Sequence, residues 1–123
     1  MQTMNVRNLT HQFSTTLLAS YCERFWCKFR GLMFQLHLPP GQALILADAQ
    51  SGRLNAGIHM LGMFIDLSII WVGEDLKVVD KALARRWVSF VFPKQPARYV
   101  IECNVSRCED FSIGDQLAFD EAN

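Results

Sequence analysis

The chain has 123 residues, half of them hydrophobic, and its 12 basic residues balance its 12 acidic residues. This length and apolar content exclude an intrinsically disordered protein and predict one core, in a single domain over residues 1–123. The balanced charge gives no overall positive field to recruit nucleic acid or anionic lipid, so we expect no nucleic-acid partner.

The beginning of the chain does not have the pattern of a signal peptide. Arg7, Asn8 and His11 interrupt the apolar segment that such a peptide requires. The longest uncharged apolar stretch, residues 67–72, is far shorter than the roughly 20 residues that cross a bilayer. We therefore expect a soluble, cytoplasmic protein without a membrane span.

The first third of the chain predicts two short strands and one helix. Residues 4–20 alternate weakly and are rich in β-branched side chains, which favours two strands joined by a turn. Ser20 precedes Glu23 by three residues, the spacing of a capping box, and apolar residues then recur at helical intervals. We expect an amphipathic helix near residues 21–30 that ends at Gly31, because glycine enters the left-handed conformation at little cost.

After the Pro-Pro-Gly turn at residues 39–41, the later segments have the length and composition of strands. These segments are residues 43–47, 67–72, 76–80, 88–92, 97–103 and 111–119. Residues 48–55 are polar and predict a mobile loop, whereas the Gly-Glu-Asp at residues 73–75 predicts a hairpin. The pattern indicates an α+β fold dominated by β structure, with a curled or partly closed, mostly antiparallel sheet that resembles a barrel.

Four cysteines form two pairs, Cys22 with Cys27 and Cys103 with Cys108. Each pair has four intervening residues, the outer limit for a zinc knuckle, and the flanking residues are not those of a knuckle. In a helix, five residues turn the side chain by about 140 degrees onto another face. The favoured interpretation is four reduced, partly buried thiols, with a metal site or disulfides as the alternatives.

Three blocks of the sequence together resemble one known family. The blocks are the Arg-Gly-Leu-Met of residues 30–33 with the Leu-Pro of residues 38–39, the Ile-His-Met-Leu-Gly-Met of residues 58–63 with Asp66, and the closing residues 96–102 and 113–115. This arrangement resembles the prokaryotic family called domain of unknown function 192. The resemblance covers nearly the whole chain and implies a fold, but it implies no biochemical activity.

The apolar run at residues 57–66 contains two ionisable side chains, His59 and Asp66. Because a buried ionisable group costs several kcal/mol unless it is paired, we expect both to contact polar partners at the rim of one cavity. His59 with Met60 and Met63 could also form a soft metal site, but methionines in such a run are usually core residues. We therefore predict no metal and no cofactor.

A second polar group follows the period of two in residues 97–103, which places Arg98, Val100 and Glu102 on one face of a strand. Arg98 and Glu102 could form a salt bridge there, although an exposed face of the sheet is the simpler interpretation. The candidate ligand-binding residues are therefore His59, Asp66, Arg98 and Glu102.

No catalytic motif identifies a reaction, so the function is not readable from the sequence. The pattern favours a small ligand-binding or accessory module with a polar pocket. The alternatives are a hydrolase-like enzyme that uses the same polar cluster and a structural protein-interaction domain. A deep pocket at His59 would favour a small-molecule ligand or an enzyme, whereas an exposed apolar patch around Trp87 and residues 90–92 would favour a protein partner.

Overall fold

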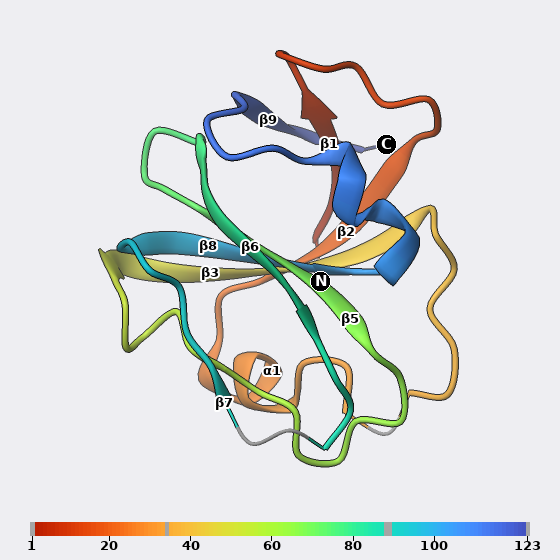
Figure 1. The fold of residues 1–123 in the computed structure, drawn as a ribbon, viewed down its shortest axis with the longest axis vertical. Helices are drawn as coiled ribbons and strands as arrows, with labels where there is room; N and C mark the ends of the chain where they lie inside the picture. Colours follow the sequence, from red (N-terminus) through yellow and green to blue (C-terminus); the bar gives the residue numbers. More distant parts are fainter. Residues whose placement is uncertain (1, 34, 88–89, 123) are drawn as a thin grey trace.

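The computed structural model describes residues 2–33, 35–87 and 90–122, and a curled sheet dominates it (Figure 1). The strands are β1 (Gln2–Asn8), β2 (Leu17–Cys22), β3 (Gln42–Gly52), β4 (Ile58–His59), β5 (Leu67–Val72), β6 (Val78–Ala84), β7 (Phe90–Val91), β8 (Ala97–Cys103) and β9 (Leu117–Glu121). The helical segments are α1 (Phe25–Arg30) and the 3-10 helix η1 (Val105–Asp110). This architecture confirms the β-dominated, curled α+β fold predicted from the sequence.

The main sheet has the strand order β6-β5-β8-β3-β2-β1-β9, and β4 pairs with β7 in a small separate sheet. Its strand pairs are antiparallel except β2 and β3, which run parallel because α1 lies in the connection between them. Strand β6 also approaches β9 at one corner, where Lys77 bridges Gln116 and the Val78 amide donates to the Asp115 carbonyl at 2.9 Å. The sheet is therefore partly closed.

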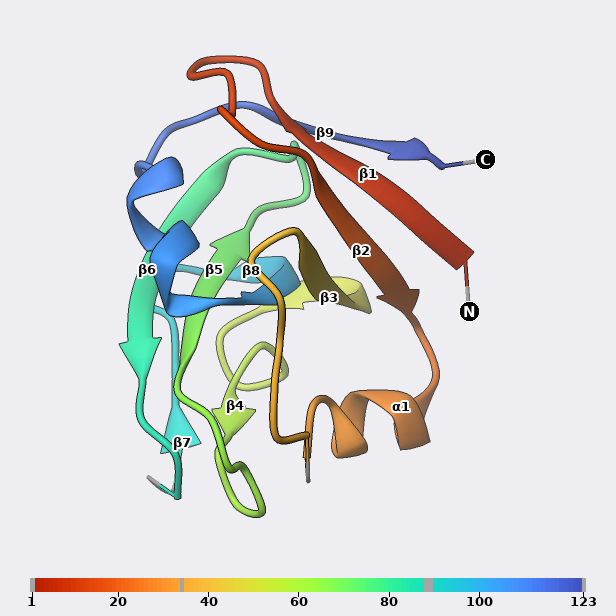
Figure 2. The same ribbon diagram turned by 90° about the vertical axis from the view of Figure 1, so that its right-hand side faces the viewer.

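The two faces of the main sheet bury different apolar clusters. On β5, Ile70 and Val72 point into the interior of the curled sheet, while Ile69 and Trp71 face the opposite side. Alternation along a strand produces this division. The second face is covered by α1 and by the small β4–β7 sheet, which Figure 2 shows on the same side of the main sheet. A second layer therefore covers the face on which Val100 lies.

The helix begins later than the capping-box spacing predicts. Ser20 lies in β2, opposite Thr3 of β1 and Leu44 of β3, and α1 starts only at Phe25. The predicted cap at Ser20 is wrong because pairing with two neighbouring strands overrides the local helix signal. The predicted end is confirmed, since Gly31 has a φ of 50° and its amide donates to the Cys27 carbonyl.

The cysteine prediction is wrong for one pair. Cys22 ends β2 and Cys27 lies in α1, and the turn between them brings their Cα atoms to 6.0 Å in a disulfide. The helical spacing used for the prediction does not apply, because Cys22 precedes the helix. Cys103 and Cys108 are free, as predicted, and both are buried; burial raises the pKa of the Cys103 thiol to about 12.

Two segments between strands differ from the prediction in detail. The polar segment at residues 48–55 is not a loop throughout, because β3 continues to Gly52 and pairs there with Ala97 after an irregularity in the register. The hairpin of β5 and β6 is confirmed, although β6 extends to Ala84. Strand β7 lies within the predicted strand at residues 88–92, of which residues 88–89 are outside the described part of the chain.

No helix in the described part of the chain is long and apolar enough to cross a membrane.

Candidate functional site

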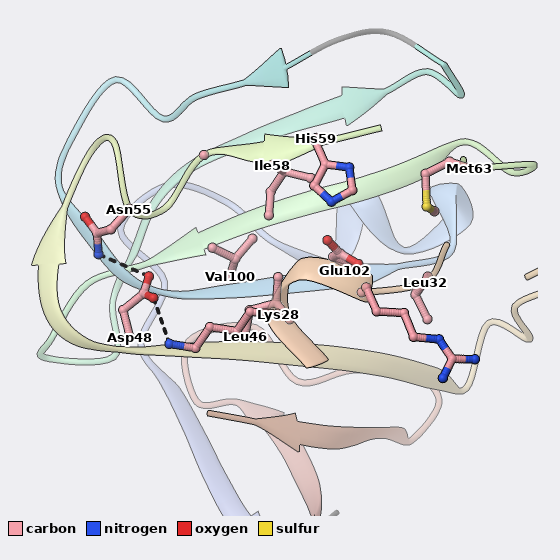
Figure 3. Close-up of a pocket in the computed structure, with 13 residues that line it drawn as sticks. Lys28, Leu32, Leu46, Asp48, Asn55, Ile58, His59, Met63, Val100 and Glu102 are labelled. Carbon is pink, nitrogen blue, oxygen red and sulfur yellow. Dashed lines mark hydrogen bonds and ion pairs between the residues drawn. The ribbon is translucent and has the colours of Figure 1, made fainter. Parts of the chain in front are cut away.

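A cavity of about 60 Å³ lies between α1, the main sheet and the segment that contains β4 (Figure 3). Its apolar walls come from Leu32, Leu46, Ile58, Met63 and Val100. Its polar lining includes Lys28, Asp48, Asn55, His59 and Glu102. This volume exceeds the roughly 10–15 Å³ that a cavity needs to hold one buried water, so the cavity has room for a small polar group.

Glu102 forms the polar floor of this cavity. It follows Val100 on the same face of β8, and its side chain is buried, with the residue only 4% exposed. No residue in the described part of the chain donates a hydrogen bond to its Oε1. Burial therefore disfavours the ionised form and raises the pKa of the Glu102 carboxyl from 4.5 to about 7.

The backbone at Gly31 approaches this carboxylate closely. A Cβ atom at residue 31 would lie 3.3 Å from Glu102 Oε1, which is tighter than an ordinary contact. The positive φ of Gly31 also strains any other L-residue. Glycine at the end of α1 therefore allows the helix to cover Glu102 while leaving space beside the carboxylate.

An ion pair lies on the other side of the cavity. The Lys28 ammonium of α1 donates to Asp48 of β3 at 3.0 Å, and the Asn55 amide donates to the other Asp48 oxygen at 3.1 Å (Figure 3). Asn55 also donates to the Gln50 carbonyl at 2.9 Å. These contacts join α1 to β3 and to the segment that leads into β4.

His59 enters the cavity from β4, opposite Glu102, as Figure 3 shows. Strand β4 pairs with β7 through His59 and Phe90. The segment before it is fixed by Trp71, whose buried indole donates to the Ala56 carbonyl at 2.7 Å. An anchored backbone thus holds His59 over the main sheet.

The structure brings His59 and Glu102 to one cavity but places Asp66 elsewhere. Asp66 accepts hydrogen bonds from the Arg86 amide at 2.8 Å and from its guanidinium at 3.1 Å, on the surface. These two bonds lower the pKa of the Asp66 carboxyl. The expected placement of His59 and Asp66 at the rim of one cavity is therefore wrong, because Asp66 meets the residues that follow β6.

Arg98 also lies away from Glu102. Its guanidinium donates to the Asp48 carbonyl at 3.0 Å and to Glu74 at 3.4 Å, so the salt bridge to Glu102 that the sequence allowed does not form. The simpler interpretation, an exposed face, fails as well at Val100 and Glu102, since α1 covers them. Whether any of these four residues binds a ligand stays a prediction.

Sequence reasoning missed Lys28, Asp48 and Asn55. Lys28 falls within the predicted amphipathic helix, and the other two residues fall within the predicted mobile loop. A polar residue directly after the apolar run of β3 was the available signal for Asp48. Within the described residues, no group of three or more His, Cys, Asp or Glu side chains could hold a metal ion.

The sequence matches the model of a family described as an uncharacterised ACR, domain of unknown function 192, over residues 7–119. A UPF0127 protein from Thermococcus gammatolerans is 41% identical over 100 residues, covering 80% of this chain and 63% of the relative. One from Pyrococcus furiosus is 30% identical over 112 residues, covering 89% and 93%. A further UPF0127 protein, from Thermococcus kodakarensis, is 36% identical, and the chain spans about three fifths of the length of the two Thermococcus relatives.

Two solved structures share the fold. One is a protein from Sinorhizobium meliloti described as a candidate transcription regulator, with a TM-score of 0.81 at 16% identity over 96% of this chain and 92% of its own. The other is a protein of unknown function from Novosphingobium aromaticivorans, with a TM-score of 0.81 at 21% identity over 94% and 83%. At these identities the likeness establishes the curled-sheet fold alone.

Proposed function

Since the chain belongs to the uncharacterised family called domain of unknown function 192, we propose its function from the cavity itself: it is a binding module for a small polar molecule. The observation that carries this proposal is the buried carboxyl of Glu102, whose Oε1 accepts no hydrogen bond from the described residues. Buried polar groups in folded proteins are nearly always satisfied, so an unsatisfied one that lines a cavity suggests a missing partner.

The origin of the lining residues supports the same proposal. Gly31 and Leu32, His59 and Met63, and Val100 and Glu102 come from the three blocks that carry the family resemblance. These blocks are far apart in the sequence, and the fold brings them around one space. A pocket of mostly apolar walls with a few convergent polar groups is the usual form of a small-molecule site.

The test is a fragment screen followed by NMR on isotope-labelled protein. We expect some small compounds with one polar group to shift the amide signals of Gly31, His59 and Glu102. Val100→Ile adds one methylene to the cavity wall and should weaken this binding, whereas Val105→Ile, on the exposed side of η1, should not. A screen in which no compound shifts these signals contradicts a binding function.

A hydrolase-like enzyme is the second candidate, and the pKa of Glu102 favours it. A carboxyl with a pKa of about 7 can act as a general base at neutral pH, and His59 lines the same cavity. The test is a panel of chromogenic esters and amides with wild type and Glu102→Gln. Turnover that the substitution removes would support the enzyme, and turnover that persists in the variant would exclude Glu102 as its base.

A protein-interaction domain is the third candidate, and its support is the surface around β7. Trp87, Phe90 and Phe92 are exposed, with the rings of Phe90 and Phe92 stacked at 6.2 Å. Exposed apolar groups of this kind mark interaction sites more often than single exposed residues do. The test is whether Phe90→Ser with Phe92→Ser changes the concentration dependence of the oligomeric state.

We keep the cytoplasm as the proposed location, which cell fractionation tests directly. Disulfide bonds such as that of Cys22 and Cys27 persist mainly in oxidising compartments. They also persist in the intracellular proteins of hyperthermophilic archaea, and the proposed location requires this second case.

A further inference from the structure

We propose that the cavity binds the protonated amino group of a small aliphatic amine, and that the Glu102 carboxylate accepts its hydrogen bonds. This inference rests on the proposed binding function and adds the chemical class of the ligand. It follows from the charges around Glu102, from the hydrogen-bonding capacity of the floor and from the shape of the walls.

No cation of the described residues is committed to Glu102. The Lys28 ammonium donates to Asp48, and Arg30, which also lines the cavity at the end of α1, is exposed. An ionised carboxylate only accepts hydrogen bonds, and leaving it buried without a partner is strongly unfavourable. A ligand that brings both a positive charge and N–H donors would remove this cost, and an ammonium group has three such donors.

An anionic ligand does not fit the same floor. It would lie against the Glu102 carboxylate and against the end of α1, where the Lys28 carbonyl oxygen is 3.9 Å from the position of a Cβ at Gly31. The carbonyl groups at the C-terminal end of a helix carry partial negative charge. Repulsion from both groups therefore selects against a carboxylate or phosphate.

The walls favour an organic cation over a bare metal ion. A single ion would occupy a small part of the 60 Å³ and would find carboxylate, imidazole and thioether groups on different sides. A hydrocarbon chain of three or four carbons would instead contact Leu46, Ile58 and Val100 while its amino group meets Glu102. The cavity exceeds the room that one buried water needs, so it can take the amino group.

The experiment compares three probes of nearly equal size at pH 8, where Glu102 is ionised: n-butylammonium, 1-butanol and butyrate. Binding is followed by the amide signals of Gly31, His59 and Glu102 in wild type. We expect n-butylammonium to bind roughly tenfold more tightly than 1-butanol, because the ammonium group adds a positive charge and three N–H donors, and we expect no binding of butyrate.

Glu102→Gln keeps the shape of the side chain and should lower the affinity for n-butylammonium at least roughly tenfold. The matched control is Glu109→Gln, an exposed glutamate on η1, which should leave the affinity unchanged. If Glu102→Gln does not fold, the comparison of the three probes on wild type still decides the question, because it requires no variant.

Each other outcome overturns the inference in a recognisable way. Equal or tighter binding of 1-butanol or butyrate at these residues would exclude the cationic class but keep the binding function. The amine ligand is likewise excluded if Zn²⁺ shifts these signals in a Glu102-dependent manner while n-butylammonium does not. If none of the three probes binds but other fragments do, the inference of an amine ligand is wrong and the binding function stands. If no fragment binds, both the amine ligand and the proposed binding function are wrong.

Discussion

Two buried charges in this protein are treated in opposite ways, Arg107 on η1 and Glu102 on β8. Arg107 is 3% exposed, and its guanidinium donates to the Thr15, Thr16 and Pro40 carbonyls and pairs with Asp110. Glu102 is 4% exposed, and its Oε1 accepts nothing from the described residues. A charge that holds the chain together is satisfied by the chain, whereas an unsatisfied one lining a cavity points to a partner from outside.

The largest loss of stability is expected when Arg107 is replaced. Arg107→Met keeps much of the side-chain volume but leaves Asp110 and three carbonyl groups without their donor. Breaking a buried, hydrogen-bonded pair costs about 3–5 kcal/mol, so the free energy of unfolding measured in urea should fall by that amount. The control is Arg86→Met on the surface, where we expect at most about 1 kcal/mol. Equal effects at the two arginines would show that Arg107 is not a structural anchor.

Glu102 should behave in the opposite way. Its carboxyl has a pKa of 4.5 in the unfolded chain and about 7 in the folded protein. Below pH 4.5 both states are protonated, and between the two values unfolding releases a proton. The contribution of Glu102 to the free energy of unfolding is therefore fully present below pH 4.5 and is lost as the pH rises through about 7. Above that pH this contribution no longer changes.

Glu102→Gln should remove this loss and raise the free energy of unfolding at pH 8 by about 1–3 kcal/mol relative to wild type, with little difference at pH 4.5. The measurement is urea denaturation of both proteins at several pH values. The other ionisable side chains that line the cavity, Lys28, Arg30, Asp48 and His59, are present in both proteins, so the difference isolates Glu102. A variant that is less stable than wild type at pH 8 contradicts the view of an unsatisfied carboxylate.

The disulfide provides a third way to separate the two regions. Cys22 and Cys27 tie α1, which covers Glu102, to the end of β2, and η1 has no such link to its neighbours among the described residues. A loop this short contributes about 2 kcal/mol in the chain-entropy account. Reduction should therefore speed amide hydrogen exchange at Gly31 and Leu32 and leave Arg107 and Cys108 unchanged.

Thiol counting under denaturing, non-reducing conditions checks the premise of that experiment. Two free thiols per chain are expected, from Cys103 and Cys108. Four free thiols would contradict the disulfide and would agree with the prediction from the sequence. Cys22→Ser should reproduce the effect of reduction on exchange, and a uniform increase over the whole sheet would mean that the bond stabilises the fold in general.

The sequence predicts the sheet better than it predicts the layer over it. Leu67–Val72 and Ala97–Cys103 are predicted at their observed boundaries because an apolar run between turn residues determines a buried strand locally. Ser20 carries a helix signal but becomes part of β2, since pairing with β1 and β3 is a tertiary effect. The disulfide was missed for the same reason, because it depends on where β2 ends.

The site was predictable only in part. The period of two places Glu102 on the face of Val100, but only the fold reveals that α1 covers that face. His59 was found because an imidazole in an apolar run is conspicuous, and Asp66 was selected by the same argument although it reaches the surface. Which buried polar groups meet depends on contacts between segments far apart in the chain, and a single sequence does not encode these as a local pattern.

The smallest effect is expected at Asp66, the exposed counterpart of both buried charges. Its carboxylate accepts hydrogen bonds from the Arg86 amide and guanidinium. The Asp66 side chain is 41% exposed and the Arg86 side chain 56%, so water competes for these hydrogen bonds. Surface pairs of this kind contribute about 0–1 kcal/mol, and Asp66→Ala should lower the free energy of unfolding by no more than that. The salt dependence of the difference separates the pair from packing, because added salt should shrink a Coulombic contribution. A loss above about 2 kcal/mol that salt does not change would mean that the Asp66 bond to the Arg86 backbone fixes the connection after β6, and Asp66 would then belong with Arg107 among the charges that hold the chain together.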